Sequence, residues 1–106
     1  MIPLPSKYKK WGYTFEKIKR EGDVAIYSQS ISGKVVAYEV FIVQKKKAIK
    51  VEDHIIQARE AAPPASKWGE LGHTCKTLER AETRFEELKV RKKELDLKRK
   101  RKKSHI

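Results

Sequence analysis

The chain has 106 residues, enough for one domain, and its 26 Lys and Arg residues outnumber 14 Asp and Glu residues, a formal net charge of +12. A surplus of this size favours a negatively charged partner. No apolar run approaches the roughly 18 residues of a membrane span, no signal peptide is recognisable, and a single cysteine excludes an internal disulfide. We therefore expect a protein of the cytosol or of a virus particle, with no membrane partner.

The N-terminal residues 1–10 predict an extended arm. Pro3 and Pro5 disfavour both a helix and a central strand, and three lysines follow them. A single domain over residues 11–97 and a basic tail over 98–106 complete the expected organisation.

Three segments of the first half predict strands. Residues 11–15 place a large aromatic side chain at every second position, and residues 24–29 form a second apolar run. Residues 34–44 are apolar on both faces, so this strand is expected inside the sheet, with a partner or an exposed edge beside its one interior charge, Glu39. Turn signals separate the segments at 21–23 and at 32–33.

The middle of the chain gives weaker signals. Lysines 45–47 are expected to end the long strand, and residues 48–51 to form a short fourth strand. Residues 54–56 are apolar enough to touch the core, residues 61–66 have the composition of a loop, and Trp68 is expected to anchor a turn on the domain.

A long helix is predicted after Thr77, which is a good N-cap residue. Apolar residues then follow at spacings of three and four, and the pattern permits a helix to about residue 98 or beyond. The expected fold class is α+β, with an antiparallel sheet of three to five strands packed against one long C-terminal helix. A helix of this length exceeds the width of so small a domain, so its basic end should protrude.

Residues 89–103 contain ten cations against two anions, a surplus of +8 out of the chain's +12. Adjacent cations repel one another, and a phosphate backbone would relieve that repulsion and release counterions. Three alternatives remain: a solvated tail that aids solubility, a nuclear-import signal, and contact with an anionic membrane, which the lack of large apolar residues disfavours. The cations are Lys89, Arg91, Lys92, Lys93, Lys98, Arg99, Lys100, Arg101, Lys102 and Lys103.

A second group of candidate nucleic-acid contacts lies beside the strands. Aromatic side chains on a basic sheet face stack bases, although the same residues can simply form the core under the helix. Tyrosine tolerates a wet face, so Tyr27 and Tyr38 are the candidates for stacking, provided that the register puts them on one face. The neighbouring cations are Lys45, Lys46, Lys47 and Lys50.

No pattern in the sequence indicates an enzyme, a metal or another cofactor. The three histidines are scattered without metal-ligand spacing, and no Gly-rich phosphate loop is present. A pair of His73 and Cys75 would need an orienting group and an oxyanion loop. Cys75 is instead expected to be a small buried apolar side chain.

The order of several short motifs resembles that of a group of small uncharacterised bacteriophage and prophage proteins, over roughly residues 11–88. This resemblance implies a viral origin and brings no defined activity; the basic ending lies outside it. The motifs are Gly12-Tyr13-Thr14-Phe15, Arg20-Glu21-Gly22-Asp23-Val24-Ala25-Ile26-Tyr27, Tyr38-Glu39-Val40, Trp68-Gly69, Gly72, Thr74, and Thr77-Leu78-Glu79 with Ala81-Glu82.

The expected order of elements, antiparallel strands followed by a long helix, is also similar to the Whirly and positive-coactivator single-stranded-DNA-binding folds. This likeness is an analogy of architecture without a shared motif. The sequence thus predicts a non-sequence-specific nucleic-acid-binding protein, with single-stranded DNA, duplex DNA and RNA all open, and it is compatible with a homo-oligomer. The alternative is a phage virion component, or a module that inhibits a host protein, docking on an acidic partner.

Overall fold

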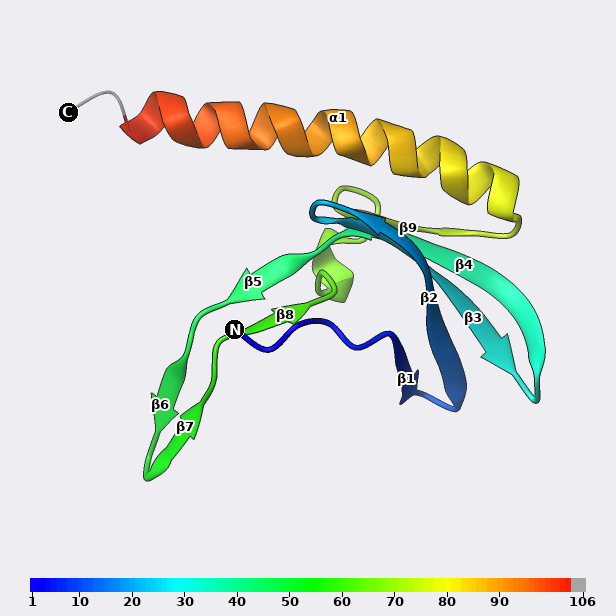
Figure 1. The fold of residues 1–106 in the computed structure, drawn as a ribbon, viewed down its shortest axis with the longest axis horizontal. Coiled ribbons are helices and arrows are strands. Elements are labelled where there is room, and N and C mark those ends of the chain that lie inside the picture. Colours follow the sequence, from blue (N-terminus) through cyan, green and yellow to red (C-terminus); the bar gives the residue numbers. More distant parts are fainter. Residues whose placement is uncertain (104–106) are drawn as a thin grey trace.

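The computed structural model describes residues 1–103 and shows one antiparallel sheet of five strands beneath a single long helix (Figure 1). The strands lie in the order β1-β2-β3-β4-β9, and each contacts its neighbours in antiparallel register. This architecture confirms the predicted α+β fold. The elements are β1 (Lys7–Lys10), β2 (Tyr13–Glu21), β3 (Val24–Ile31), β4 (Lys34–Ile42), β9 (Gly72–Cys75) and α1 (Leu78–Lys103).

The helix covers one face of the sheet because its apolar positions recur every three or four residues. Ala81, Phe85 and Leu88 are buried against a cluster of aliphatic side chains from β3 and β4. The predicted N-cap is confirmed, since the Arg80 amide donates to Thr77 Oγ1 at 3.2 Å. The sheet side chains of this cluster are Val24, Ile26, Val40, Ile42 and Cys75.

The opposite face of the sheet is apolar as well, and the N-terminal segment and the segment before β9 cover it. Phe15, Tyr27 and Phe41 are buried there, against residues of the N-terminal segment and of the chain before β9. The expected extended arm in fact joins the sheet, because β1 pairs with β2 as the edge strand and Tyr8 stacks on Phe15 at 5.0 Å between ring centroids.

Residues 44–61 form an arm that leaves the sheet, hereafter the β arm (Figure 1). At its base β5 (Gln44–Lys46) pairs with β8 (Arg59–Ala61), and at its tip β6 (Ile49–Val51) pairs with β7 (His54–Ile56). The long strand β4 ends at Ile42, before lysines 45–47, and the strand expected at 48–51 is present as β6 but pairs with β7 instead of joining the sheet. Residues 54–56 are exposed rather than in the core. The Cα radius of gyration is 15.5 Å, against about 13 Å for a compact chain of this length.

One predicted strand begins two residues later than expected. Trp11 and Gly12 form the turn between β1 and β2, with φ of 54° and 80°, so the alternating pattern starts at Tyr13. The turns at Gly22 and Gly33 are confirmed, with φ of 57° and 76°. A short 3-10 helix, η1 (Ala65–Lys67), precedes Trp68, whose ring packs on the face of the sheet away from α1.

Candidate nucleic-acid interface

The C-terminal end of α1 extends past the apolar contacts that hold the helix on the sheet. Among the described side chains of α1, Leu95 is the last that packs against the core cluster, and those from Asp96 to Lys100 are exposed. The stretch from 96 to the end of α1 at Lys103 is about 12 Å long at 1.5 Å per residue. We call residues 96–103 the helix end.

Three of the predicted contact residues form ion pairs that fix α1 to the domain. Lys89 Nζ lies 2.6 Å from Glu21 Oε2, and this hydrogen bond raises the pKa of Lys89 and lowers that of Glu21. Two further pairs join Arg91 to Glu70 at 3.5 Å and Lys92 to Asp23 at 3.6 Å. Their charges are partly neutralised within the molecule, so these three cations are less available to phosphates than the sequence suggests.

The remaining cations of the helix whose side chains the structure describes are exposed. Within the part of the chain that the structure describes, Lys93, Lys98, Arg99 and Lys100 have no carboxylate within ion-pair distance. The backbone of residues 101–103 continues the helix, whereas the side chains of Arg101, Lys102 and Lys103 and all of residues 104–106 lie outside the described part. The described part of the helix end therefore presents three exposed cations, Lys98, Arg99 and Lys100.

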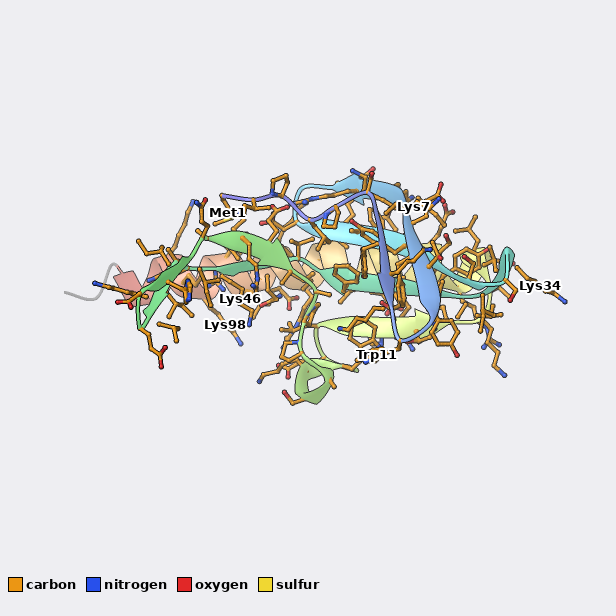
Figure 2. All side chains as sticks on the ribbon, turned by 90° about the horizontal axis from the view of Figure 1, so that it is seen from below. Met1, Lys7, Trp11, Lys34, Lys46 and Lys98 are labelled. Carbon is orange, nitrogen blue, oxygen red and sulfur yellow. The ribbon has the colours of Figure 1, made fainter. Side chains whose placement is uncertain are left out.

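The lysines of the β arm fall into two groups. All four are exposed, but Lys45 is paired with Asp23 at 3.4 Å, whereas Lys46, Lys47 and Lys50 have no ion pair with the described residues. Arm and helix meet at a small cavity of about 150 Å³, which Lys45, Lys92 and Arg99 line together with Asp23. The structure thus places lysines of the β arm beside cations of α1, the two basic groups that the sequence predicts. Figure 2 shows Lys46 and Lys98 close together left of the centre of the molecule and Lys34 at its right end.

The predicted stacking pair is wrong. Tyr27 is only 1% exposed, and its hydroxyl donates to the Pro5 carbonyl oxygen at 2.6 Å on the face away from α1. Tyr38 packs against the core cluster under α1. The two rings therefore lie on opposite faces of the sheet, and the interpretation of these aromatics as core side chains holds for Tyr27.

A pocket of about 570 Å³ on the sheet face away from α1 was not predicted; we call it the Glu39 pocket. The aromatic side chains that line it include Tyr8, Trp11 and Trp68, and Lys10 and Lys46 are also among the lining residues. Figure 2 views the molecule from this side, with Trp11 and Lys46 labelled. The one signal in the sequence was Glu39, a single charge on an otherwise apolar strand.

Gly72 helps to build this pocket because it lets an indole pack directly on β9. A Cβ atom at position 72 would lie 2.6 Å from the Trp68 ring, closer than any side chain permits. The Trp68 indole is also held by a hydrogen bond from its Nε1 to Thr74 Oγ1 at 2.9 Å.

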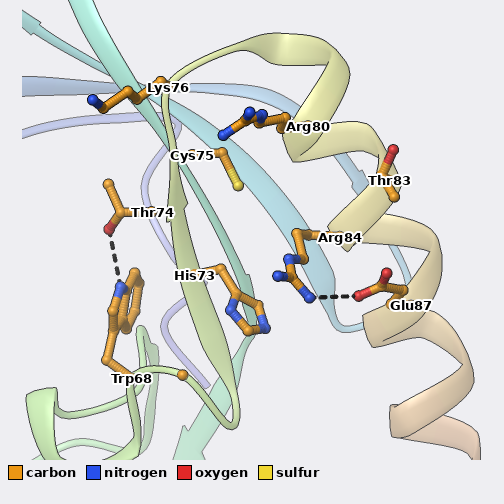
Figure 3. A pocket seen from close by; sticks show the side chains of 10 residues that line it. Trp68, His73, Thr74, Cys75, Lys76, Arg80, Thr83, Arg84 and Glu87 are labelled. Atoms are coloured by element: carbon orange, nitrogen blue, oxygen red, sulfur yellow. Dashed lines mark hydrogen bonds and ion pairs between the residues drawn. The ribbon is translucent and has the colours of Figure 1, made fainter.

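A larger cavity of about 740 Å³ lies between β9 and the start of α1 (Figure 3). His73 and Cys75 line it, but burial raises the pKa of the Cys75 thiol and lowers that of the His73 imidazole. Nearby, Arg84 donates to Glu87 at 2.9 Å. A protonated thiol is a poor nucleophile, and the prediction that Cys75 is buried is confirmed at 7% exposure.

No family model, no curated protein and no solved structure matches this chain. Among the described residues, no group of three or more His, Cys, Asp or Glu side chains is placed to hold a metal ion. Within the described residues 1–103, no helix is long and apolar enough to cross a membrane.

Proposed function

We propose that this protein binds nucleic acid without sequence specificity, through the helix end and the exposed lysines of the β arm. The observation that supports this most directly is the division of the basic residues along α1. Lys89, Arg91 and Lys92 pair with carboxylates, whereas Lys93, Lys98, Arg99 and Lys100 are exposed without a carboxylate partner in the described part of the chain.

Contacts of this kind act on phosphates rather than on base edges. Lysine and arginine side chains neutralise phosphates and release counterions, which gives affinity and orientation without reading sequence. The exposed side chains of the helix end that the structure describes are mostly cations, so a phosphate backbone is a better match for it than a sequence of bases.

The test is a salt titration of binding to single-stranded DNA, duplex DNA and RNA, followed by fluorescence anisotropy. If about six phosphates are neutralised, log K should fall with log salt at a slope of about −4 on single strands and about −5 on duplex. Heparin is the control polyanion. Equal affinity for heparin and DNA at the same salt would refute a preference for nucleic acid.

A second candidate function, a protein-interaction module, is favoured by the tip of the β arm. Ile49, Val51 and Ile55 are 55%, 49% and 70% exposed on a two-stranded ribbon that projects from the domain. Exposed apolar clusters of this kind mark contact surfaces. The test replaces Ile55 with serine. If this variant no longer forms oligomers or binds a protein partner, and its nucleic-acid affinity is unchanged, the result supports a protein-interaction module.

The resemblance to small bacteriophage and prophage proteins makes a viral setting part of the proposal. In that setting the protein acts in the host cytoplasm or within the virion. A virion component would dock its basic helix on packaged genome or on an acidic partner, and both of these use the same exposed cations.

A further inference from the structure

The Glu39 pocket combines a carboxylate with aromatic walls and a basic rim. Its volume of about 570 Å³ is within the range typical of small-ligand sites. The neighbouring core rings, Phe15 and Phe41, are buried, so the lining does not deform easily. What the pocket accepts is decided by three groups: Glu39, Trp11 and the rim lysines.

Glu39 lies on β4, an interior strand, where pairing with β3 and β9 fixes its backbone. Its side chain is half-buried and makes no hydrogen bond or ion pair with the described residues, yet its oxygens are not sealed from solvent. Burial raises the pKa of this carboxyl, and Lys10 partly offsets the effect. A carboxylate in such a place costs free energy until a donor satisfies it.

Trp11 occupies a turn position that its side chain does not suit. Its φ of 54° is left-handed, a conformation that favours Gly, Asn or Asp in a two-residue hairpin turn and strains other residues. The indole is nevertheless 78% exposed, with the Lys10 ammonium 4.2 Å from its ring centroid as its one described cation contact. The fold gains little from this indole, so its position points to a ligand that stacks on it.

The rim decides between classes of ligand. Lys10 and Lys46 line the pocket beside Glu39, so the balance of charge at the opening is positive. This arrangement disfavours an ammonium ligand and suits a ring that is attached to phosphates. An unpaired nucleotide has this chemistry, because single-stranded recognition combines stacking on an aromatic side chain with hydrogen bonds to the base edge.

The carboxylate decides between the bases. Ionised Glu39 can only accept hydrogen bonds, through two oxygens side by side. Guanine presents two adjacent donors on its Watson–Crick edge, N1–H and N2–H. Adenine and cytosine each place an acceptor beside their amino group, and thymine and uracil flank one N–H with two carbonyl oxygens.

We propose that the Glu39 pocket binds one unpaired guanine of a single-stranded nucleic acid, with the base stacked on Trp11, its N1–H and N2–H donated to Glu39, and the flanking phosphates contacted by Lys10 and Lys46. This inference rests on the proposed nucleic-acid binding. It adds a base preference to a surface that otherwise contacts only phosphates.

The test uses full-length protein and thymine 12-mers that carry one central guanine, adenine, cytosine, thymine or abasic site, measured by fluorescence anisotropy. We expect the guanine strand to bind about tenfold more tightly than the thymine strand, since a matched pair of hydrogen bonds to a base discriminates by about fivefold to a hundredfold. The E39Q variant should lose the guanine preference and favour adenine or cytosine, because an amide offers one donor and one acceptor.

A second variant separates stacking from hydrogen bonding. W11G suits the turn and removes the indole, so it should weaken binding of the guanine strand about tenfold or more while leaving duplex binding unchanged. The K34Q variant, at the start of β4 and outside the lining of the pocket, is the control for both.

The possible failures are distinguishable. Equal binding of all five strands, with normal salt dependence and no effect of E39Q, would refute the guanine site and leave the helix-end proposal standing. Absence of binding to every strand and to duplex would refute the proposed function and the guanine site together. Tryptophan quenching by a proline-rich peptide and not by GMP would overturn the inference and assign the pocket to peptides.

Discussion

Arg20 and Glu60 join the sheet to the β arm through two parallel hydrogen bonds. Arg20 Nη1 donates to Glu60 Oε1 at 2.6 Å, and Nη2 donates to Oε2 at 2.7 Å. The same carboxylate accepts from the Leu4 amide at 3.0 Å, so β2, β8 and the N-terminal segment meet at one group. Bidentate contacts of this kind fix orientation as well as adding free energy.

The first prediction concerns acid stability. The hydrogen bonds from Arg20 and from Leu4 lower the pKa of Glu60 from 4.5 to about 2 in the folded protein. Because the folded pKa is below the unfolded one, the stabilisation is complete above about pH 5 and is lost as the pH falls toward 2. At pH 7 the E60Q variant should be less stable by roughly 2 kcal/mol in urea denaturation, since charge-assisted hydrogen bonds are lost.

The control is the same comparison at pH 2, where wild type and E60Q should have nearly equal free energies of unfolding. A difference that stays constant between pH 7 and pH 2 would show that the ion pair is not the source. The K67Q variant is a matched control at neutral pH, because the Lys67–Glu70 pair is exposed at 3.8 Å and contributes little.

The second prediction concerns the core under the helix. Phe85 is fully buried between α1 and the sheet, with the Lys19 ammonium 4.4 Å from its ring centroid. Replacing it with alanine should cost about 3–5 kcal/mol in urea denaturation, through lost burial and a residual cavity. L97A, at a helix position 54% exposed, should change stability by less than about 0.5 kcal/mol. Similar values for the two variants would contradict the packing described here.

The elements that could be predicted from the sequence are those set by local patterns. The apolar runs at residues 24–29 and 34–44, the Thr77 cap and the apolar spacing along α1 each depend on residues a few positions apart, and the strands, the cap and the helix that they predict are confirmed. A strand at 48–51 was predicted, but the rest of the β arm was missed because its tip, near His54 and Ile55, is apolar but unburied. Apolar composition predicts burial only where a second element is present to cover it.

The candidate site was harder to predict because it depends on pairs far apart in the chain. Nothing near Lys89 indicates that Glu21 neutralises it, or that Tyr27 is satisfied by the Pro5 carbonyl. Trp11 was assigned to a strand because large aromatic side chains alternate at positions 11, 13 and 15, and this pattern was given more weight than the turn signal of Gly12. Turn propensities favour asparagine or glycine at a position with positive φ, so they do not predict a tryptophan there.

The third prediction tests the helix end. Replacing Lys98, Arg99 and Lys100 together with glutamine should weaken binding to all nucleic acids. The salt slope should fall in magnitude by about 2 on single strands and about 3 on duplex, because three phosphate contacts are lost. Stability should be unchanged, because the three side chains are exposed and have no carboxylate partner in the described part of the chain.

The matched control is the triple variant K7Q, K17Q and K34Q, which removes the same net charge from exposed sites on the sheet and its turns. If only the total charge matters, both triple variants will lose the same affinity, and the helix end will have no special role. A larger loss from the helix variant is the expected outcome.

The fourth prediction concerns the thiol. Because burial raises the pKa of Cys75, little thiolate is present at neutral pH in the folded protein. Labelling with a disulfide reagent at pH 7 should therefore be at least about tenfold slower than in urea. Rapid stoichiometric labelling of the native protein would show that the thiol is accessible and ionised.

The last prediction joins stability to binding at Trp11. Glycine adopts a φ of 54° without strain, so W11G should raise the free energy of unfolding by about 1 kcal/mol, despite the greater freedom of glycine in the unfolded chain. The same change should weaken single-strand binding, because the stacking surface is gone. Urea denaturation and anisotropy on the same preparations measure both effects. A variant that is less stable than wild type would mean that the indole supports the fold, and its exposure would then need no ligand to explain it.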